Sequence, residues 1–510
     1  MEKDLFSELK NYLQFSKLGF EKESLRVLNS NIARTPHPQS LGSALCNKFI
    51  TTDFAEAQLE LVTPPFQNKE EATKYLDNIH HFVSCNLDGE ILWPFSMPPL
   101  ISSEEEISIA FYGPSNLGVF KRIYRNGLSH RYGRMMQAIS GLHFNYSLPN
   151  SFWEESSLIK ASGSEEKQAR SSIYFNMLRN IYRVNWLILY LFGASPIITR
   201  NFITKDLQSF KQLDDQSYYL PNATSLRMSD YGYSNLSRNT LRVSINSIDE
   251  YVSDLKKARS TFEPKFSKFK LGSELFRQQI SQNILQIDDE YYAIARAKSK
   301  LEDMRNTSSK LENHGVDFIE LRSLDLDPFS RIGISEEAAR VTELLLILCL
   351  INQSDLLSDS DFDEIDQNNA LVAKQGRKAN LYLKKNGDKI LLKDWAKQIV
   401  DSLFPIAEIL DQTDSKYSNS LNKTLGMIDD PGLTISGRIM DQILSNNLSF
   451  HQFGEEIGKE NMAYYLSLNK KNNESWKELE NETIRSFEMQ DNLEEDKHKS
   501  FEAYLDDFLG

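Results

Sequence analysis

Apolar and polar side chains alternate with a period of two in several stretches of the chain, which we predict to be β-strands. These stretches are residues 19–27, 51–62, 140–148 and 316–326. Because successive side chains of a strand point to opposite faces, Glu21 and Glu23 share a face about 7 Å apart. Residues 51–62 likewise place Glu60 on the face opposite their apolar residues. The pattern therefore predicts a sheet with an acidic face.

Apolar positions recur at helical spacing in the segments between and after these strands. We expect helices at residues 3–17, 69–87, 165–192 and 335–351, and helical structure from residue 393 onward, with Pro405 interrupting one helix. Asn68 and Ser335 are placed to cap the helices that follow them. The last turns of the helix at 165–192 are apolar on all sides, which predicts burial within the protein. Residues 93–100 are rich in proline and are expected to form a rigid loop.

Composition is typical of a soluble protein from a reducing compartment. The 510 residues are 40% hydrophobic, which is ample for a sizeable core, and carry a formal net charge of −14. That charge argues against binding to nucleic acid or to a membrane surface. The three cysteines are widely spaced, which makes a zinc ribbon or a disulfide framework unexpected. Since the N-terminus lacks a signal-peptide pattern and the longest apolar run is short, we expect a cytoplasmic protein. We also expect it to be a monomer.

The acidic face requires positive charge to be stable. Two like unit charges ~4 Å apart repel by about 4 kcal/mol at an effective dielectric constant of about 20. The candidate ligands of a shared cation site are Glu21, Glu23, Asp53, Glu60, His143 and Glu320. Oxygen donors with a single imidazole suit Mg²⁺ or Mn²⁺, whereas zinc favours more His or Cys. Strict alternation puts Asp53 opposite Glu60, so a site that includes both needs a bulge or a twist between them.

Arginines follow the acidic segments and predict a site for anions. Arg125, Arg227, Arg296 and Arg322 carry forked donors that match carboxylate and phosphate. A cluster of Mg²⁺ ligands beside arginines indicates phosphoryl transfer. The chain contains no G-x-x-x-x-G-K-[ST] loop, no G-x-G-x-x-G and no nucleophile elbow. The residues themselves thus predict a Mg²⁺-dependent, anion-binding enzyme on an open sheet.

Each candidate also has a structural interpretation. A single glutamate on a strand is usually solvated or ion-paired, and His143 alone is more often a hydrogen-bonded core histidine. Residues 124–132 could form a surface helix whose arginine stems cover apolar residues. The combination favours the functional interpretation, because several predicted strands each bring a carboxylate or an imidazole to one face.

Longer motifs resemble a known family. They are GFEKESLRV (19–27), ITTDFAEAQLE (50–60), LWPFSMP (92–98), SGLHFN (140–145), YLFGASP (190–196), ATSLR (223–227) and FIELRSLD (318–325). In order and spacing they resemble the proteobacterial type of glutamate–cysteine ligase, across residues 10–445. That family makes γ-glutamylcysteine, the precursor of glutathione.

The resemblance implies an α+β fold with a glutamine-synthetase-like sheet that is curved and mainly antiparallel, with an open charged face and helices packed behind it. It implies that ATP phosphorylates the γ-carboxylate of L-glutamate and that the amine of L-cysteine attacks the acyl phosphate. Glutathione, which contains the product, is a possible feedback inhibitor. Two alternatives stay open, namely a related ligase that uses a different amine and a non-catalytic metal-binding interaction protein.

The resemblance also implies residue roles. Its metal ligands correspond to Glu21, Glu23, Asp53, Glu60, His143 and Glu320. Its amino-acid pocket corresponds to Tyr124, Arg125, Leu128, Gln137, Tyr233 and Tyr292. Arg322, Arg227 and Glu320 correspond to catalytic residues near the reacting carboxylate and phosphate, and Arg296 and Lys298 to contacts of the nucleotide phosphates.

The chain departs from the family in places. Ala297 and Ser299 replace the family's proline and second arginine, which weakens the expectation for Arg296. We expect residues 1–445 to form the catalytic domain, with a surface insertion at 354–392. Residues 446–510 are expected to form a helical extension, partly disordered in its charge-rich last thirty residues. This extension is too short for a second ligase domain, so only the first step of glutathione synthesis is expected.

Overall fold

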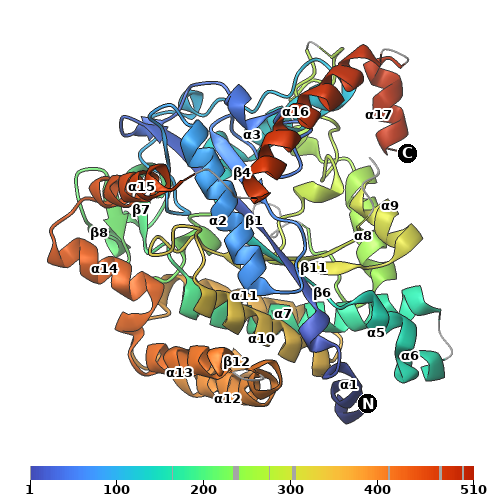
Figure 1. The fold of residues 1–510 in the computed structure, drawn as a ribbon, viewed down its shortest axis with the longest axis vertical. Coiled ribbons are helices and arrows are strands. Elements are labelled where there is room, and N and C mark those ends of the chain that lie inside the picture. The colour runs from blue at the N-terminus through green and yellow to red at the C-terminus, as the bar shows by residue number, and fades with distance from the viewer. Residues whose placement is uncertain are drawn as a thin grey trace.

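A mainly antiparallel sheet lies at the centre of the molecule in the computed structural model (Figure 1). The structure describes residues 2–509 except 163–164, 234–240, 275, 301–305, 412–413, 470–473 and 497–498. The central strands run in the order β10-β11-β6-β1-β4-β3, and β2 and β5 also pair with β1. The strands are β1 (Lys17–Leu28), β2 (Asn31–Ile32), β3 (Ile50–Thr52), β4 (Gln58–Val62), β5 (Ile91–Leu92), β6 (Leu142–Ser147), β7 (Ile197–Thr199), β8 (Lys211–Gln212), β9 (Ser217–Tyr219), β10 (Ala295–Lys298), β11 (Phe318–Leu324), β12 (Tyr382–Lys385) and β13 (Asp388–Leu391).

Helices lie on both sides of the central sheet. They are α1 (Glu2–Leu9), α2 (Lys69–Asn86), α3 (Asn116–Tyr132), α4 (Arg134–Gln137), α5 (Asn150–Glu155), α6 (Ser157–Ser162), α7 (Glu166–Phe192), α8 (Ile248–Ser260), α9 (Thr307–His314), α10 (Glu336–Ile351), α11 (Asp359–Gln375), α12 (Leu392–Asp411), α13 (Lys416–Asp429), α14 (Ile435–Ser445), α15 (Phe450–Ser467), α16 (Glu474–Glu495) and α17 (Phe501–Leu509). α2 packs behind β1 and β4, and α7 behind β10 and β11. The expected α+β fold with an open charged face is confirmed.

The strand at 19–27 forms as predicted, within β1, but residues 51–62 do not form a single strand. They fold into the hairpin of β3 and β4, whose turn is closed by the Asp53 amide donating to the Gln58 carbonyl at 3.0 Å. The one-strand prediction was wrong because alternation cannot reveal a chain reversal. The turn, rather than a bulge, brings Asp53 to the same end of the site as Glu60.

The capping predictions hold, and one helix is shorter than expected. Asn68 accepts a hydrogen bond from the Glu70 amide, and Ser335 from the Ala338 amide. The helix expected at 3–17 ends at Leu9, and a turn and a short 3-10 helix at Leu13–Phe15 follow before β1 begins at Lys17.

The helix at 165–192 is buried as predicted, and Pro405 does not break its helix. The ring of Trp186 packs against the ring of Trp395, with the two ring centroids 4.6 Å apart. α12 runs through Pro405, which lies on an exposed face. The carbonyl that this proline leaves without a helical donor can therefore bond to water.

Residues 354–392, expected as a surface insertion, contain α11 and the β12–β13 hairpin. Phe362, Ile365 and Val372 of α11 are buried, and the helix packs against α7. One face of this segment therefore belongs to the core, so the surface assignment is corrected. The weak periodicity hid this because polar Asn368 and Asn369 are also buried. The strand at 316–326 is consequently not the last.

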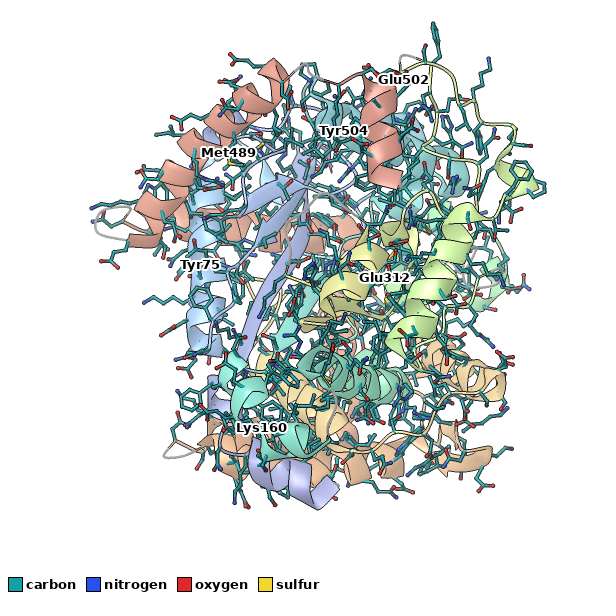
Figure 2. The ribbon with its side chains drawn as sticks, turned by 90° about the vertical axis from the view of Figure 1, so that its right-hand side faces the viewer. Tyr75, Lys160, Glu312, Met489, Glu502 and Tyr504 are labelled. Carbon is teal, nitrogen blue, oxygen red and sulfur yellow. The ribbon has the colours of Figure 1, made fainter. Side chains whose placement is uncertain are left out.

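The described part of the C-terminal segment is helical and wraps around the molecule. α15 and α16 pack on α2, while α17 packs on α3 (Figure 1). Figure 2 shows Met489 on α16 and Tyr504 on α17 at the top of the molecule. No helix among the described residues is long and apolar enough to cross a membrane.

Candidate active site

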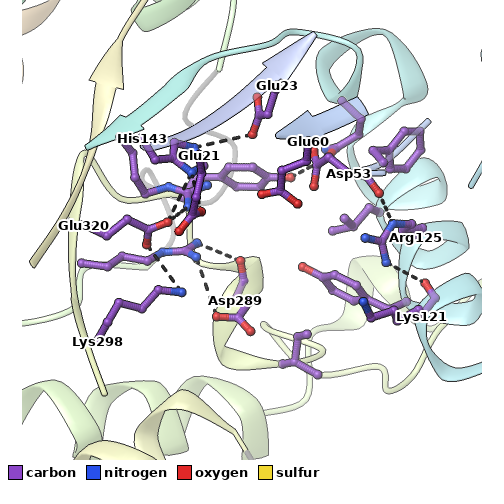
Figure 3. A pocket seen from close by; sticks show the side chains of 18 of the residues that line it. Glu21, Glu23, Asp53, Glu60, Lys121, Arg125, His143, Asp289, Lys298 and Glu320 are labelled. Atoms are coloured by element: carbon purple, nitrogen blue, oxygen red, sulfur yellow. Dashed lines mark hydrogen bonds and ion pairs between the residues drawn. The ribbon is translucent and has the colours of Figure 1, made fainter. Parts of the chain in front are cut away.

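A cavity of about 510 Å³ lies over the acidic face of the central sheet (Figure 3). All the expected site residues except Arg227 line it. The residues concerned are Glu21, Glu23, Asp53, Glu60, Tyr124, Arg125, Leu128, Gln137, His143, Tyr233, Tyr292, Arg296, Lys298, Glu320 and Arg322. The fold thus brings side chains that are far apart in the sequence into one cavity.

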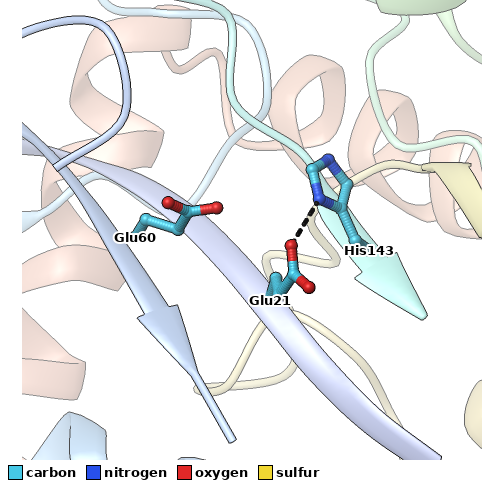
Figure 4. Close-up of side chains that lie close together, drawn as sticks. All are labelled: Glu21, Glu60 and His143. Carbon is cyan, nitrogen blue, oxygen red and sulfur yellow. Dashed lines mark hydrogen bonds and ion pairs between the residues drawn. The ribbon is translucent and has the colours of Figure 1, made fainter. Parts of the chain in front are cut away.

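Strand register assembles the acidic cluster. β1 pairs with β6 so that Glu21 lies opposite His143, and with β4 so that Glu23 lies opposite Glu60. The His143 Nδ1 atom lies 3.2 Å from Glu21 Oε2 and 3.3 Å from Glu320 Oε1. Ligand atoms of Glu21, Glu60 and His143 lie within 4.8 Å of one another (Figure 4). That separation allows the three groups to hold one cation between them.

The electrostatics of the cluster reflect crowded negative charge. Burial raises the pKa of Glu60 to about 8, and the carboxylates around it, above all that of Asp53, add to the shift. Burial and the nearby Arg322 disfavour the charged form of His143. Its contacts with carboxylates nevertheless raise the pKa of His143 to about 9. In the absence of a metal ion, protons on Glu60 and His143 therefore offset the negative charge of the cluster. A bound metal ion would offset the same charge in their place.

The donor set fits a hard divalent cation such as Mg²⁺. It consists of carboxylate oxygens with one imidazole nitrogen, the combination that suits Mg²⁺ better than zinc. Glu320 Oε2 is buried without a hydrogen-bond partner among the described residues. The Lys298 ammonium lies 3.6 Å from that oxygen, too far for a hydrogen bond. An oxygen atom left unbonded in a buried site is available to a metal ion.

Cations of β10 and β11 border the acidic cluster on one side. Arg322 Nη1 donates to Glu320 Oε1 at 2.8 Å. Arg296 donates to the Asp289 carbonyl at 2.8 Å, and its Nη1 lies 3.7 Å from the Asp289 carboxylate. The charge of Glu320 raises the pKa of the Lys298 ammonium, so this side chain stays protonated. These groups can receive an anion beside the cluster.

Aromatic and polar side chains form another part of the cavity wall. The Tyr233 and Tyr292 rings stack with their centroids 5.8 Å apart. The Tyr292 hydroxyl donates to Gln137 Oε1 at 2.9 Å, and the Tyr233 hydroxyl to the Ile139 carbonyl at 3.1 Å. Burial raises the pKa of both tyrosines, so they remain neutral hydrogen-bonding groups. Leu128, almost fully buried, adds an apolar contact.

Arg227 lies one layer behind the cavity wall. Its side chain is 2% exposed, and its Nη2 donates to the Arg322 carbonyl at 2.9 Å. The guanidinium also lies 5.1 Å from the centre of the Tyr233 ring. The Arg227 Nε atom has no hydrogen-bond partner among the described residues. The position of Arg227 therefore supports the wall formed by Arg322 and Tyr233.

Several lining residues escape the sequence analysis. They are Phe54, Leu117, Phe120, Lys121, Ile287, Asp289, Lys310 and Phe508. Lys121 could have been found, because it lies one helical turn before Arg125 on the same face of α3. Phe508 could not, because nothing in the sequence links α17 to a site built mainly from residues before 330.

Comparison with known proteins identifies the class of this fold and site. The sequence model of the glutamate–cysteine ligase family matches residues 4–372. A glutamate–cysteine ligase from Alcanivorax borkumensis is 37% identical over 499 residues, which span 96% of this chain and 95% of that protein. The chain therefore belongs to the glutamate–cysteine ligase family.

Solved structures agree with this assignment. A glutamate–cysteine ligase from Francisella tularensis, crystallised in complex with AMP, superposes with a TM-score of 0.90 at 32% identity and 97% coverage of both chains. A bifunctional glutathione synthetase from Pasteurella multocida has a TM-score of 0.71 at 24% identity, covering 91% of this chain and 54% of that one. The second likeness concerns the fold alone.

Proposed function

We propose that the protein uses ATP to join the γ-carboxylate of L-glutamate to the amine of L-cysteine, with Mg²⁺ held on the acidic face. The family and the AMP-bound relative support an ATP-dependent ligase. One observation carries the proposal. An oxygen-rich donor set around Glu21, Glu60 and His143 shares a single cavity with the cations Lys298 and Arg322.

The reaction proceeds in two steps. A γ-carboxylate oxygen of glutamate bonds to the γ-phosphorus of ATP, and the bond to the leaving ADP breaks. The cysteine amine then attacks the acyl carbon, phosphate leaves, and the amine nitrogen gives up a proton. Mg²⁺, bound by the acidic cluster, would neutralise phosphate charge that otherwise repels the carboxylate nucleophile.

The residues of the chain position and shield the reacting groups. Arg322 and Lys298 provide donors for the phosphoryl group during its transfer. The stacked rings of Tyr233 and Tyr292 close one side of the cavity. They exclude water, which would hydrolyse an acyl phosphate.

The test is product formation by the purified protein. With ATP, Mg²⁺, glutamate and cysteine, we expect equal amounts of ADP and γ-glutamylcysteine by mass spectrometry, and none when one component is omitted. The substitutions Glu23→Gln and Glu320→Gln should abolish turnover without unfolding the protein. Glu71→Gln, on the exposed face of α2, is the matched control and should keep full activity. A folded protein that makes no product would overturn the proposal.

The choice of amine can be tested with the same assay of product formation. A panel of amines at equal concentration separates a cysteine ligase from a ligase with another acceptor, because only the former prefers cysteine. Glutathione, which contains the product, should raise the apparent KM for glutamate. We infer a cytoplasmic, monomeric enzyme, which fractionation and light scattering would check.

A further inference from the structure

A second cavity, of about 370 Å³, lies where the last turns of α7 meet the loop after α11, the start of α12 and the end of α13. In Figure 1, α12 and α13 lie at the bottom of the molecule, below α7. Among the described residues, none lines both this cavity and the one over the acidic face. Small-molecule sites typically have volumes of roughly 300–1,000 Å³. The second cavity is therefore large enough for a small ligand and is separate from the active site.

Cationic side chains outnumber carboxylates in the lining of this second cavity. Arg377 and Lys378 come from the loop after α11, and Lys393 comes from the first turn of α12. Asp429 supplies the one carboxylate among the described lining residues. That carboxylate is already paired with two ammonium groups, those of Lys393 at 2.8 Å and Lys397 at 2.7 Å. The lining is thus positive, in a protein whose formal net charge is −14.

Arg377 has no compensating negative charge. Its Nε donates to the Ala223 carbonyl at 3.2 Å, and its Nη2 donates to the Pro221 carbonyl at 2.8 Å. Its Nη1 makes no hydrogen bond within the described part of the chain. Burial alone lowers the pKa of Arg377 to about 10, with no carboxylate to oppose the shift. A partly buried cation of this kind is stabilised when an anion binds beside it.

The surroundings of Arg377 hold its guanidinium in a fixed position. The two carbonyls to which it donates belong to segment 221–227, and the Thr224 amide of this segment donates to the Ala373 carbonyl of α11 at 2.9 Å. The contact is close, because a Cβ atom at Gly376 would lie 2.7 Å from Thr224 Cγ2. An anion would therefore meet a donor that is already in place, which lowers the entropic cost of binding.

The remaining lining indicates what kind of anion would fit. Leu381, Leu392, Ile428 and Tyr190 line the cavity and are buried. The forked donors of a guanidinium match a phosphate group, and ammonium groups add charge beside it. A phosphate monoester carries about two negative charges at neutral pH, which suits three cations better than a single carboxylate does. A molecule with a phosphate group and an apolar part would satisfy both halves of the lining.

We propose that this second cavity binds a phosphorylated small molecule, whose phosphate group contacts Arg377, Lys378 and Lys393 and whose apolar part packs against the leucines. The site lies outside the cavity over the acidic face, so the inference does not depend on the proposed reaction. Its test is accordingly a measurement of binding rather than of turnover.

Phenyl phosphate is the probe, because it joins a phosphate monoester to an apolar ring, and inorganic phosphate is the comparison without the ring. In calorimetric titrations of the full-length wild-type protein, we expect the Kd for phenyl phosphate to be about 10-fold lower than that for inorganic phosphate. Lys378→Glu should raise the Kd for phenyl phosphate by roughly 10-fold to 100-fold, the effect of losing a charge-assisted contact. Lys477→Glu makes the same change of charge at an exposed position of α16 and should change this Kd by less than about 2-fold.

Asp429→Asn removes the carboxylate from the lining and should lower the Kd by about 2-fold to 5-fold, a change of opposite sign. Lys298→Met, in the cavity over the acidic face, should leave the Kd unchanged. Because Lys378 is exposed, its substitution leaves the carbonyl contacts of Arg377 in place, and circular dichroism confirms folding of each variant.

Three results would overturn the inference. The first is that the protein binds neither phosphate, or binds inorganic phosphate as tightly as phenyl phosphate. The second is that Lys477→Glu weakens binding as much as Lys378→Glu does, which would show an effect of net charge only. The third is that Lys298→Met weakens binding while Lys378→Glu does not, which would place the phosphate over the acidic face.

Discussion

Arg227 illustrates how a single residue behind the cavity wall is held in place. Its backbone amide donates to Ser195 Oγ at 3.2 Å, and its Nη1 lies 3.5 Å from Asp325 Oδ1. The Asp325 carboxylate also accepts hydrogen bonds from Ser195 at 2.6 Å and from Ser225 at 3.0 Å. A buried network with these partners is rigid. Three of the sequence motifs, at residues 190–196, 223–227 and 318–325, thus meet at the Asp325 carboxylate. Together they hold Arg227 in place.

Gly141→Ala tests whether this placement matters. A Cβ atom at Gly141 would lie 2.0 Å from Arg227 Nη2, so the guanidinium would have to leave the carbonyls of Arg322 and Leu324. We expect kcat to fall by about 10-fold or more, the order of effect of misplacing an active-site group. Steady-state kinetics would show it. Gly426→Ala, in a helix with nothing within 4 Å of the new Cβ, should keep full activity and be slightly more stable. Unchanged kcat in both variants would contradict the role of Arg227.

At the residue scale, the sequence predicts which acidic side chains share a face but not how they meet. Glu21 and Glu23 follow from the period of two, because β1 is regular at these positions. Asp53 did not fit this pattern, because its position in the site depends on the turn between β3 and β4. Lys121 was missed, although its spacing of four residues from Arg125 places both side chains on one face of α3.

At the scale of elements, the C-terminal helix is the least predictable part of the site. α17 carries Phe501 and Leu505, which are buried against Phe120 of α3 and its neighbours. The Asn306 side chain donates to the Phe508 carbonyl at 2.9 Å and so holds the end of the helix. Charged residues dominate this part of the sequence, so composition suggested disorder. The few apolar residues of this segment indicate a packed helix only when the surface of α3 that they contact is known.

Phe508→Ala tests the contribution of α17 to the cavity. The Phe508 ring packs 4.3 Å from that of Phe120 and forms part of the cavity wall. Its removal opens the site to water and takes away roughly 1.5 kcal/mol of apolar contact. We expect kcat/KM to fall by about 5-fold to 10-fold. Phe487→Ala, at a half-exposed position of α16 outside the cavity, is the control and should be neutral. Equal effects of the two changes would show that α17 does not shape the site.

At the scale of the whole molecule, the sequence predicts the sheet better than its surroundings. Alternation predicts β1, β6 and β11 and the stretch that folds into β3 and β4, but it does not reveal the edge strand β10. Periodicity predicts the long helices α2, α7 and α10. Residues 354–392 could not be assigned to the core, because α11 is buried on one face only and its pattern is mixed. Strand order and register, which join Glu21 to His143, depend on contacts between distant segments. The periodicity of a single segment therefore cannot predict strand order or register.

Global stability should depend on pH through Asp327. Burial raises the pKa of this carboxyl group from 3.8 to about 6. Between these values the folded state binds more protons than the unfolded state, so the free energy of unfolding falls as the pH rises through this window. Asp327→Asn keeps an oxygen for the Phe329 amide and removes the buried charge. We expect this variant to gain about 1–3 kcal/mol at pH 7.5 and almost nothing near pH 4, measured by urea unfolding.

Asp429→Asn provides a control of opposite sign. Asp429 is exposed, and hydrogen bonds from Lys393 and Lys397 lower its pKa to about 2. Its contribution is present at neutral pH and is lost as the pH falls toward 2, so this variant should be slightly less stable at pH 7.5. A gain of stability by Asp327→Asn at pH 4 equal to that at pH 7.5 would contradict the assignment.

Mg²⁺ should stabilise the whole molecule, because acidic side chains on β4, β1 and β11 crowd one face of the central sheet. The imidazole of His143 lies among them on β6, between β1 and β11. A ligand that binds only the folded state, at about 100 times its Kd, adds about 2.7 kcal/mol to the free energy of unfolding. Melting in Mg²⁺, compared with NaCl of equal ionic strength, should show a clear rise in Tm that chelation reverses. Glu60→Gln removes a ligand, and it also removes the free-energy cost of keeping this buried carboxyl group protonated at neutral pH. This variant should therefore melt higher than the wild type without Mg²⁺ and respond less to Mg²⁺, and Glu312→Gln, at an exposed position, should behave like the wild type. Identical melting in Mg²⁺ and NaCl would mean that protons and cationic side chains alone hold the acidic face together.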